Sequence, residues 1–285
     1  MTRLDLLRQR ARTLADAKID APRRTAEWML MEVLGLSRAQ LIGFGDEAVT
    51  PEQAAAVDAM LQRRLAREPL QYILGYTDFY GLRIDVTPDV LIPRPETEQV
   101  VEYALARIAD VPSPQVLDAG TGSGCIALAV KHQRPDAEVW ACDLSWEAIQ
   151  VAQANGARLG LDVRWFRGNL LTKHFTSRVS PHLDLLISNP PYVSQAETDT
   201  LAPEVIDHEP HLALFAAADD PLIFYRALVD IGQKALQNGG WAVFETHADY
   251  GEDVGDLLRE AGYDRVEVKA DYNGRSRIAA GQKRG

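Results

Sequence analysis

The chain has 285 residues, 46% hydrophobic and 25% charged, so it can form two unequal globular domains and is too apolar to be disordered. Its formal net charge of -11 argues against direct nucleic-acid binding, because phosphate binding needs a surplus of Lys and Arg. Two cysteines in apolar runs, Cys125 and Cys142, indicate buried free thiols and a reducing, cytoplasmic setting. No run approaches the roughly 18 apolar residues of a membrane span, and no signal-peptide pattern is present, so we expect no membrane partner.

The N-terminal part of the chain has the apolar periodicity of helices only. Gly35 closes one of these helices, and Thr50 with Gln53 makes a capping box for the next long one, with Pro51 at its first position. No motif that carries chemistry occurs here. We therefore predict a helical bundle over residues 1–74, with a structural or partner-binding role.

The spacing of apolar residues changes from the helical period to a strand-like pattern where the chain connects to a second domain. Aromatic and β-branched residues flank Gly81, which predicts a β-hairpin linker over residues 75–93. Two prolines then prevent a helix from starting before Pro95, because each forces its predecessor out of the helical region. Residues 94–285 are expected to form the second domain.

Strands and helices alternate through this second domain. The expected strands are Val116–Asp118, Glu138–Asp143, Val163–Phe166, Leu183–Ser188, Trp241–Glu245 and Val266–Val268. The clearest helices between them are Ser145–Leu159, Pro221–Gln237 and Tyr250–Ala261. Such alternation predicts an α/β fold with a doubly wound parallel sheet. The hairpin-type turn Asn273-Gly274 predicts that the last strand, Arg277–Ala280, returns antiparallel.

A glycine-rich loop follows the first strand of that sheet. The loop consists of Gly120, Thr121, Gly122, Ser123 and Gly124. Glycines let the backbone turn tightly beside a ligand, and Asp143, at the end of the next strand, can accept hydrogen bonds from both ribose hydroxyls. The G-x-G-x-G spacing and Asp118, which suits a cationic methionine group, favour S-adenosylmethionine over a dinucleotide. A nicotinamide oxidoreductase is the alternative at this point.

The apolar strand Leu183–Ser188 ends at Asn189, Pro190, Pro191 and Tyr192. Ligands bind at the carboxyl ends of parallel strands, and two prolines make this backbone stiff with carbonyls that need outside partners. The Asn189 side chain adds an oxygen acceptor, and Tyr192 adds a flat apolar face. Together they present two acceptors and a stacking surface to a planar group that carries an NH2.

These four residues resemble the Asp/Asn/Ser-Pro-Pro-Tyr sequence of methyltransferases that act on planar NH2 nitrogens. The peptide chain release factor N5-glutamine methyltransferases (the HemK/PrmC family) are similar to this chain over essentially its whole length. The segments that carry this likeness are Tyr72–Gly75, Leu91–Glu98, Ser188–Tyr192, His208–Leu214 and Asp271–Arg277. The segment Leu91–Glu98 is the most specific, because DNA amine methyltransferases lack it.

The resemblance implies a class I (Rossmann-like) fold and methyl transfer to the Gly-Gly-Gln glutamine of class 1 release factors, with S-adenosylhomocysteine as the second product. We also predict that residues 1–74 recognise the protein substrate, because every motif that carries chemistry lies beyond Leu91. Gly120–Gly124 would wrap the methionine part of the cofactor, Asp143 would hold the ribose, and Asn189–Tyr192 would hold the target amide. Asn169 and Leu170 would lie along the adenine. The family usually has an acidic residue and an aromatic at these two positions, so weaker adenine contacts are expected here.

The expected chemistry needs no general base before transfer. Asn189 Oδ1 and the Pro190 carbonyl would each accept one N–H of the target amide, which aims its nitrogen at the sulfonium methyl, while Tyr192 packs on the amide plane. His208 and His211 form an HxxH pattern without further ligands, so we interpret them as structural and expect no metal.

Three other functions share parts of this pattern. A ribosomal-protein glutamine methyltransferase usually has a different sequence after the Pro-Arg of the Leu91–Glu98 segment. A DNA or RNA amine methyltransferase would need a basic groove and usually a target-recognition insertion, which the net charge and length oppose. A non-catalytic scaffold that binds S-adenosylmethionine would not need an intact Asn-Pro-Pro-Tyr sequence.

Overall fold

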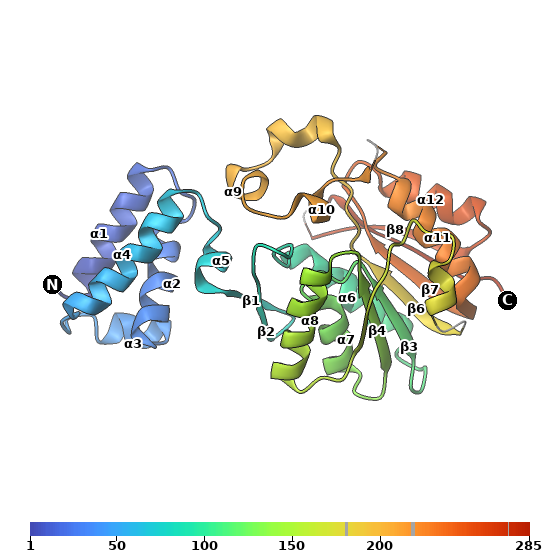
Figure 1. Cartoon of the computed structure of the whole chain (residues 1–285), viewed down its shortest axis with the longest axis horizontal. Helices are drawn as coiled ribbons and strands as arrows, with labels where there is room; N and C mark the ends of the chain where they lie inside the picture. Colours follow the sequence, from blue (N-terminus) through green and yellow to red (C-terminus); the bar gives the residue numbers. More distant parts are fainter. Residues whose placement is uncertain (180–181, 218–219, 273) are drawn as a thin grey trace. The chain divides into compact units, whose positions relative to one another are not determined.

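The computed structural model describes residues 1–179, 182–217, 220–272 and 274–285. The chain forms two compact units (Figure 1). The smaller unit consists of Met1–Tyr76 together with Ala202–His208, and the larger one consists of Thr77–Leu201 and Glu209–Gly285. The chain therefore leaves the larger unit after Leu201 and returns to it at Glu209, a detour that the sequence patterns do not indicate.

The smaller unit is a helical bundle, as expected. Its helices are α1 (Arg3–Asp16), α2 (Pro22–Leu34), α3 (Arg38–Gly43), α4 (Pro51–Leu65), α5 (Leu70–Leu74) and α9 (Pro203–Ile206). The expected capping box is present, because the Thr50 side chain accepts from the Gln53 backbone N–H. Gly35 ends α2 in the left-handed conformation with φ of 64°. Apolar residues from α1, α2 and α4, such as Leu6 and Leu30, form the buried core.

Helix α9 is held to this bundle by an ion pair. The carboxylate of Glu204 accepts from Arg64 at 3.0 Å and from Arg67 at 3.4 Å. The Arg64 residue is only 7% exposed, so this pair is shielded from water on one side. Residues 202–208 are thereby attached to the end of α4, although about 140 residues separate Glu204 from Arg64 in sequence.

The larger unit contains a two-stranded hairpin and a seven-stranded sheet. The hairpin consists of β1 (Tyr76–Phe79), whose first residue belongs to the smaller unit, and β2 (Leu82–Asp85). The sheet strands are β3 (Gln115–Ala119), β4 (Glu138–Asp143), β5 (Arg164–Arg167), β6 (Leu183–Ser188), β7 (Leu236–Glu245), β8 (Asp264–Ala270) and β9 (Ser276–Gln282). Their order is β5-β4-β3-β6-β7-β9-β8, and β9 runs antiparallel to both of its neighbours. This confirms the doubly wound sheet with an antiparallel last strand.

Some boundaries differ from those expected. Strand β7 begins at Leu236, before the expected Trp241, because Leu236 pairs with Leu183 of β6. The preceding helix accordingly ends at Ala235, two residues before the expected Gln237, and it begins at Ile223 rather than at Pro221. The turn expected at Asn273-Gly274 lies partly outside the described residues, because these do not include Asn273.

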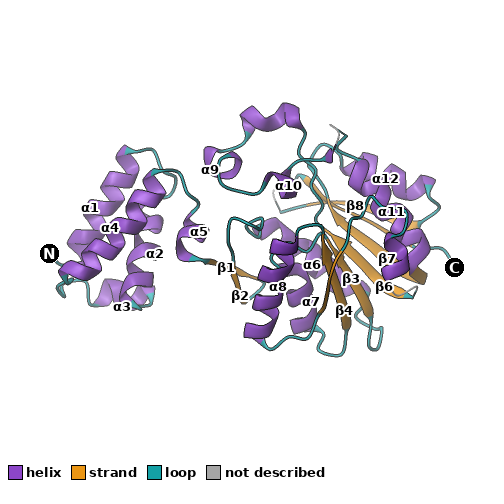
Figure 2. Cartoon of the chain, viewed as in Figure 1, coloured by secondary structure: helices purple, strands orange, loops and turns teal. Residues whose placement is uncertain are grey.

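Helices cover both faces of the sheet (Figure 2). They are α6 (Pro95–Arg107), α7 (Cys125–Gln133) and α8 (Trp146–Leu159) on one face, and α11 (Ile223–Ala235) and α12 (Gly251–Glu260) on the other. Leu117 and Leu186 of the sheet pack with Tyr225 of α11 and Leu258 of α12 in one buried cluster. Cys125 and Cys142 are buried and free, as expected. In the part of the chain that is described, no helix is long and apolar enough to cross a membrane.

One buried amide fastens the hairpin to the sheet domain. Asn155 on α8 is fully buried, and its Oδ1 accepts from the Asp85 backbone N–H at 2.8 Å. Its Nδ2 donates to the carbonyl oxygens of Asp85 at 2.9 Å and Ser123 at 3.0 Å. The hairpin, α8 and the glycine loop thus share a single side chain.

We expect Asn155→Ala to destabilise the protein by about 2–4 kcal/mol, because four hydrogen bonds, including one from Arg158, are lost and buried backbone groups are left unpaired. Chemical denaturation measures this change in the free energy of unfolding. Gln153→Ala, at an exposed position of the same helix, is the matched control and should have little effect. Equal stability of the two variants would contradict this role of Asn155.

Candidate active site

A pocket opens at the carboxyl ends of the parallel strands, entirely within the larger unit. Loops after β3, β4, β5 and β6 contribute to it, together with the segment Pro88–Leu91 and Phe224 of α11. It brings together many of the residues expected from sequence, namely Gly120, Gly122, Asp143, Asn169, Leu170, Asn189 and Pro191. Asp118, Thr121, Ser123, Gly124, Pro190 and Tyr192 are not among the described residues that line it.

The glycine loop exposes bare backbone to this pocket. Gly120 and Gly122 have left-handed φ angles of 79° and 54°, and a Cβ built at either would meet no protein atom within 4 Å. The backbone N–H groups of Gly120 and Thr121 both donate to the Cys142 carbonyl at 2.9 Å, which closes the loop onto β4. The space that a side chain would fill is therefore open to a ligand.

Asp118 supports the loop from behind. Its Oδ2 accepts from the Thr121 hydroxyl at 2.6 Å and from the Ala127 backbone N–H at 3.1 Å. Its Oδ1 is buried and has no hydrogen-bond partner among the described residues. Burial is the largest of the effects that raise the pKa of Asp118 to about 7. An acceptor oxygen thus remains unused next to the loop, which suits a nearby cationic group.

Asp143 forms the wall between the glycine loop and α8. Its Oδ2 accepts from the Gly122 backbone N–H at 2.9 Å, and its Oδ1 accepts from the Ser145 N–H at 3.0 Å. Burial raises the pKa of this carboxyl. Each oxygen keeps acceptor capacity for a further donor, so a pair of ligand hydroxyls fits here.

The loop after β5 supplies a less polar wall. Asn169 Oδ1 accepts from the Leu171 backbone N–H at 2.9 Å, so this acceptor already has one partner. Leu170 lines the pocket and packs partly against the core cluster. Leu170 can therefore contact a flat apolar group, and Asn169 keeps the hydrogen-bonding capacity of its NH2 group and of a second oxygen lone pair.

The Asn-Pro-Pro-Tyr segment lies next to the glycine loop because β6 pairs with β3. The Ser188 hydroxyl donates to the Ala119 carbonyl at 2.6 Å, which joins the two strand ends. Asn189 and Pro191 then line the pocket. The Tyr192 hydroxyl lies 3.4 Å from the Glu245 carboxylate, and its ring centre lies 5.7 Å from that of His247.

A buried carboxylate joins two of the segments singled out in the sequence. Glu209 accepts from the Ile92 backbone N–H at 3.1 Å and from the Arg94 guanidinium at 2.6 Å. The ring of His211 lies edge-on to Phe215 at 5.4 Å. Within the described ranges, no cluster of three or more His, Cys, Asp or Glu side chains is arranged to hold a metal ion.

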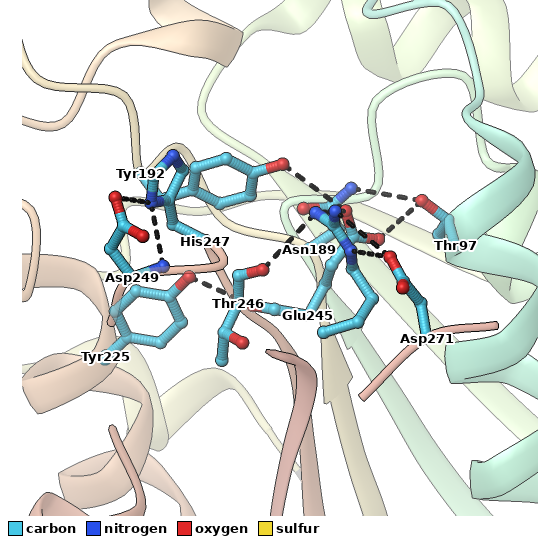
Figure 3. A network of polar contacts seen from close by, with 10 residues as sticks. Thr97, Asn189, Tyr192, Tyr225, Glu245, Thr246, His247, Asp249 and Asp271 are labelled. Atoms are coloured by element: carbon cyan, nitrogen blue, oxygen red, sulfur yellow. Dashed lines mark hydrogen bonds and ion pairs between the residues drawn. The ribbon is translucent and has the colours of Figure 1, made fainter. Parts of the chain in front are cut away.

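A second buried carboxylate, Glu245, was missed in the sequence. It ends β7, next to β6, and accepts from the Thr97 hydroxyl at 2.5 Å and from the Tyr192 hydroxyl at 3.4 Å (Figure 3). Thr97 in turn accepts from Asn189 Nδ2 at 3.3 Å. The Arg277 guanidinium lies 3.9 Å away, and burial is the main cause that raises the pKa of Glu245 to about 7. An acidic residue directly after the apolar part of a strand is the signal that could have found it.

Comparisons with known proteins agree with this geometry. Residues 5–75 match the family model described as PrmC N-terminal domain, and residues 101–213 match the methyltransferase small domain. A relative from Chlorobaculum tepidum named release factor glutamine methyltransferase is 40% identical and covers 95% of this chain and 93% of its own. A relative of the same name from Deinococcus radiodurans is 38% identical, and the match covers 99% of this chain and 98% of the relative. The solved structure of a methyltransferase from Pyrococcus furiosus has 16% identity and a TM-score of 0.55, covering 80% of this chain and 98% of its own, which supports the fold alone.

The raised pKa of Asp118 has a consequence for stability. Its pKa is about 7 in the folded protein, against an ordinary value of 3.8, so the folded state holds an extra proton between these two values. The stabilising contribution is therefore complete below about pH 4 and is lost as the pH rises through about 7.

We expect Asp118→Asn to weaken this pH dependence, so that the fall in unfolding free energy between pH 5 and pH 7.5 shrinks by about 1–3 kcal/mol. Chemical denaturation of the protein without added cofactor measures it. Asp162→Asn, at an exposed position, should keep the wild-type slope. If Asp118→Asn has the wild-type slope as well, its carboxyl titrates normally in the folded protein.

Proposed function

This chain belongs to the release factor glutamine methyltransferase family, and we propose that it transfers the methyl group of S-adenosylmethionine to a release-factor glutamine. The acceptor would be the side-chain amide nitrogen (N5) of the Gly-Gly-Gln glutamine in class 1 release factors. The observation that carries this proposal is that the glycine loop, Asp143 and Asn189 line one pocket. A nucleoside cofactor and a planar amide can therefore meet there.

The residues of the pocket fit S-adenosylmethionine. Gly120 and Gly122 leave room for the methionine part, and the unused Asp118 oxygen offers an acceptor for its ammonium group. Asp143 has acceptor capacity for the two ribose hydroxyls, and Leu170 offers an apolar surface for the adenine. When bound, the cofactor supplies an electrophilic methyl group on a sulfonium.

The chain's own task is to position a weak nucleophile. An amide nitrogen has its lone pair delocalised into the carbonyl, so it reacts only when it is oriented and when developing charge is stabilised. Asn189 Oδ1 and the Pro190 carbonyl each accept one N–H of the target, which holds the nitrogen toward the methyl group. The methylated nitrogen then loses a proton to water, so no general base is required.

A nucleic-acid substrate is less well supported than a protein substrate. The chain carries a net charge of -11, which opposes binding to phosphates, and the relatives described above modify release factors according to their names. A ribosomal-protein glutamine would present the same amide chemistry, but neither of those relatives has that name. The enzyme would act in the cytoplasm, without a membrane or nucleic-acid partner.

Incubation of the protein with S-adenosylmethionine and an intact class 1 release factor should add one methyl group to the Gly-Gly-Gln glutamine, detected by mass spectrometry of the digested factor. Asn189→Ala should lower kcat by about a hundredfold or more, because the acceptor acts as charge grows on the amide nitrogen. Calorimetry should show much less change in cofactor binding. Near-normal turnover of this variant would mean that another group holds the amide.

We propose that the smaller, helical unit binds the release factor. The pocket lies in the larger unit, and none of the described residues that line it belongs to the helical unit. Contacts with a single glutamine at a loop tip cannot by themselves distinguish it from other exposed glutamines. Contacts remote from the amide must therefore supply the binding energy that positions it.

Removal of residues 1–74 should leave cofactor binding intact and lower methylation of an intact release factor by about tenfold or more. A short Gly-Gly-Gln peptide should be an equally poor substrate for both forms. Circular dichroism checks that the truncated protein is folded. If the truncated form methylates the intact factor as fast as the full-length chain, the helical unit does not grip the substrate.

A control is needed because truncation also removes Arg64 and Arg67, the partners of Glu204. Glu204→Gln in the full-length chain weakens that ion pair and keeps the helices. It should retain most of the activity on the intact factor if recognition resides in the helical surface.

A further inference from the structure

We propose that Thr97 and Glu245 are positioning residues for methyl transfer, because they hold the Asn189 side-chain amide with its oxygen toward the pocket. This inference rests on the proposed function. Neither residue is among the described residues that line the pocket, and Thr97 is only 2% exposed, so they act through Asn189 (Figure 3). Three elements contribute: α6 carries Thr97, β7 ends in Glu245, and Asn189 follows β6.

The direction of each hydrogen bond follows from the number of hydrogens. An ionised carboxylate can only accept, so the single hydroxyl hydrogen of Thr97 is donated to Glu245 across 2.5 Å. The Thr97 oxygen can then only accept, and its partner at 3.3 Å must be the NH2 group of Asn189. Asn189 Oδ1 is thereby left for the target amide. A flipped Asn189 would present N–H groups to the N–H groups that it has to bind.

The surroundings of Glu245 favour a functional interpretation of this burial. The carboxylate has Arg277 of β9 as a nearby cation at 3.9 Å, and Arg277 also pairs with Asp271 at 3.4 Å. Glu96 on α6 adds a like charge nearby. The Tyr192 hydroxyl donates weakly at 3.4 Å, and Tyr225 of α11 donates to the backbone carbonyl of Glu245 rather than to its side chain.

A buried carboxylate with so little charge compensation costs stability, and an apolar pair of similar shape would cost less. Packing alone therefore does not explain why this position is acidic. A role in orienting the Asn189 amide does explain it. Because the Glu245 carboxylate can only accept, it sets the direction of the hydrogen bond from Thr97 and, through Thr97, of the one from Asn189.

Protonation of Glu245 would remove that constraint. A protonated carboxyl can donate to Thr97, which frees the Thr97 hydrogen for Asn189 Oδ1 and stabilises the flipped amide. Burial raises the pKa of Glu245 to about 7, so this change falls within an accessible range. We therefore expect the active, ionised form to be lost as the pH falls from about 8 to 6.

The first test replaces the hydroxyl and keeps the shape. Thr97→Val should lower kcat for methylation of an intact release factor by about tenfold or more, while KM and the Kd for S-adenosylmethionine change much less. Thr97→Ser keeps a hydroxyl and should restore most of the lost turnover. Thermal unfolding of both variants checks that they are folded.

The second test removes the charge. Glu245→Gln should lower kcat and make it insensitive to pH between about 6 and 8, whereas the wild-type kcat should rise with pH over this range. If both proteins have the same pH profile, the charge of Glu245 does not control Asn189.

The outcomes separate this inference from the proposed function. If the wild-type enzyme leaves the release factor unmethylated, the proposed function is wrong. If the wild type methylates the factor and Thr97→Val is as fast as Thr97→Ser, the proposed function stands and the positioning role of Thr97 is wrong. Equal losses of kcat and cofactor affinity in Thr97→Val would also contradict it, because they indicate a general structural defect.

Discussion

The pocket depends on one property of the sheet, which is that the carboxyl ends of its parallel strands meet at a single edge. β3 lies between β4 and β6, so the connections after β3 and β6 leave toward opposite sides and open a crevice between them. The glycine loop follows β3, Asp143 ends β4 and Asn189 follows β6. Residues far apart in the chain therefore face the same space, which the proposed function assigns to both the cofactor and the target amide.

Periodicity and strand-end motifs were enough to predict most of this arrangement. The alternating pattern predicted the sheet, and the glycines, Asp143 and Asn189 were identified because each follows directly from a recognisable strand. The contact of Asn189 with Thr97 and Glu245 was missed, since 148 residues separate Thr97 from Glu245 and the segment Leu91–Glu98 shows no chemistry in sequence. The detour of residues 202–208 into the helical unit was missed for the same reason, because its anchor is a long-range ion pair with Arg64.

The segment Leu91–Glu98 is the most family-specific part of the sequence, although it carries no evident chemistry. Its contacts with two buried carboxylates explain its role. Arg94 and the Ile92 N–H bind Glu209, and Thr97 binds Glu245. The first contact attaches the segment to the loop after Asn189, and the second attaches it to the end of β7. The segment thus supports Asn189, the proposed amide-binding residue, from outside the pocket, since Leu91 is its only member among the described residues that line it.

Shape alone cannot orient an amide, because its oxygen and its NH2 group have almost the same size. The target glutamine and Asn189 are both amides, so each could be turned over without a steric penalty. If Asn189 alone were turned over, its N–H groups would face the N–H groups of the target. Only a partner of fixed polarity discriminates between the two orientations, and an ionised carboxylate accepts but never donates. Through the Thr97 hydroxyl, Glu245 transmits that polarity to Asn189. A site that orients an amide with neutral groups therefore needs a buried carboxylate behind them, and this carboxylate lowers the stability of the fold.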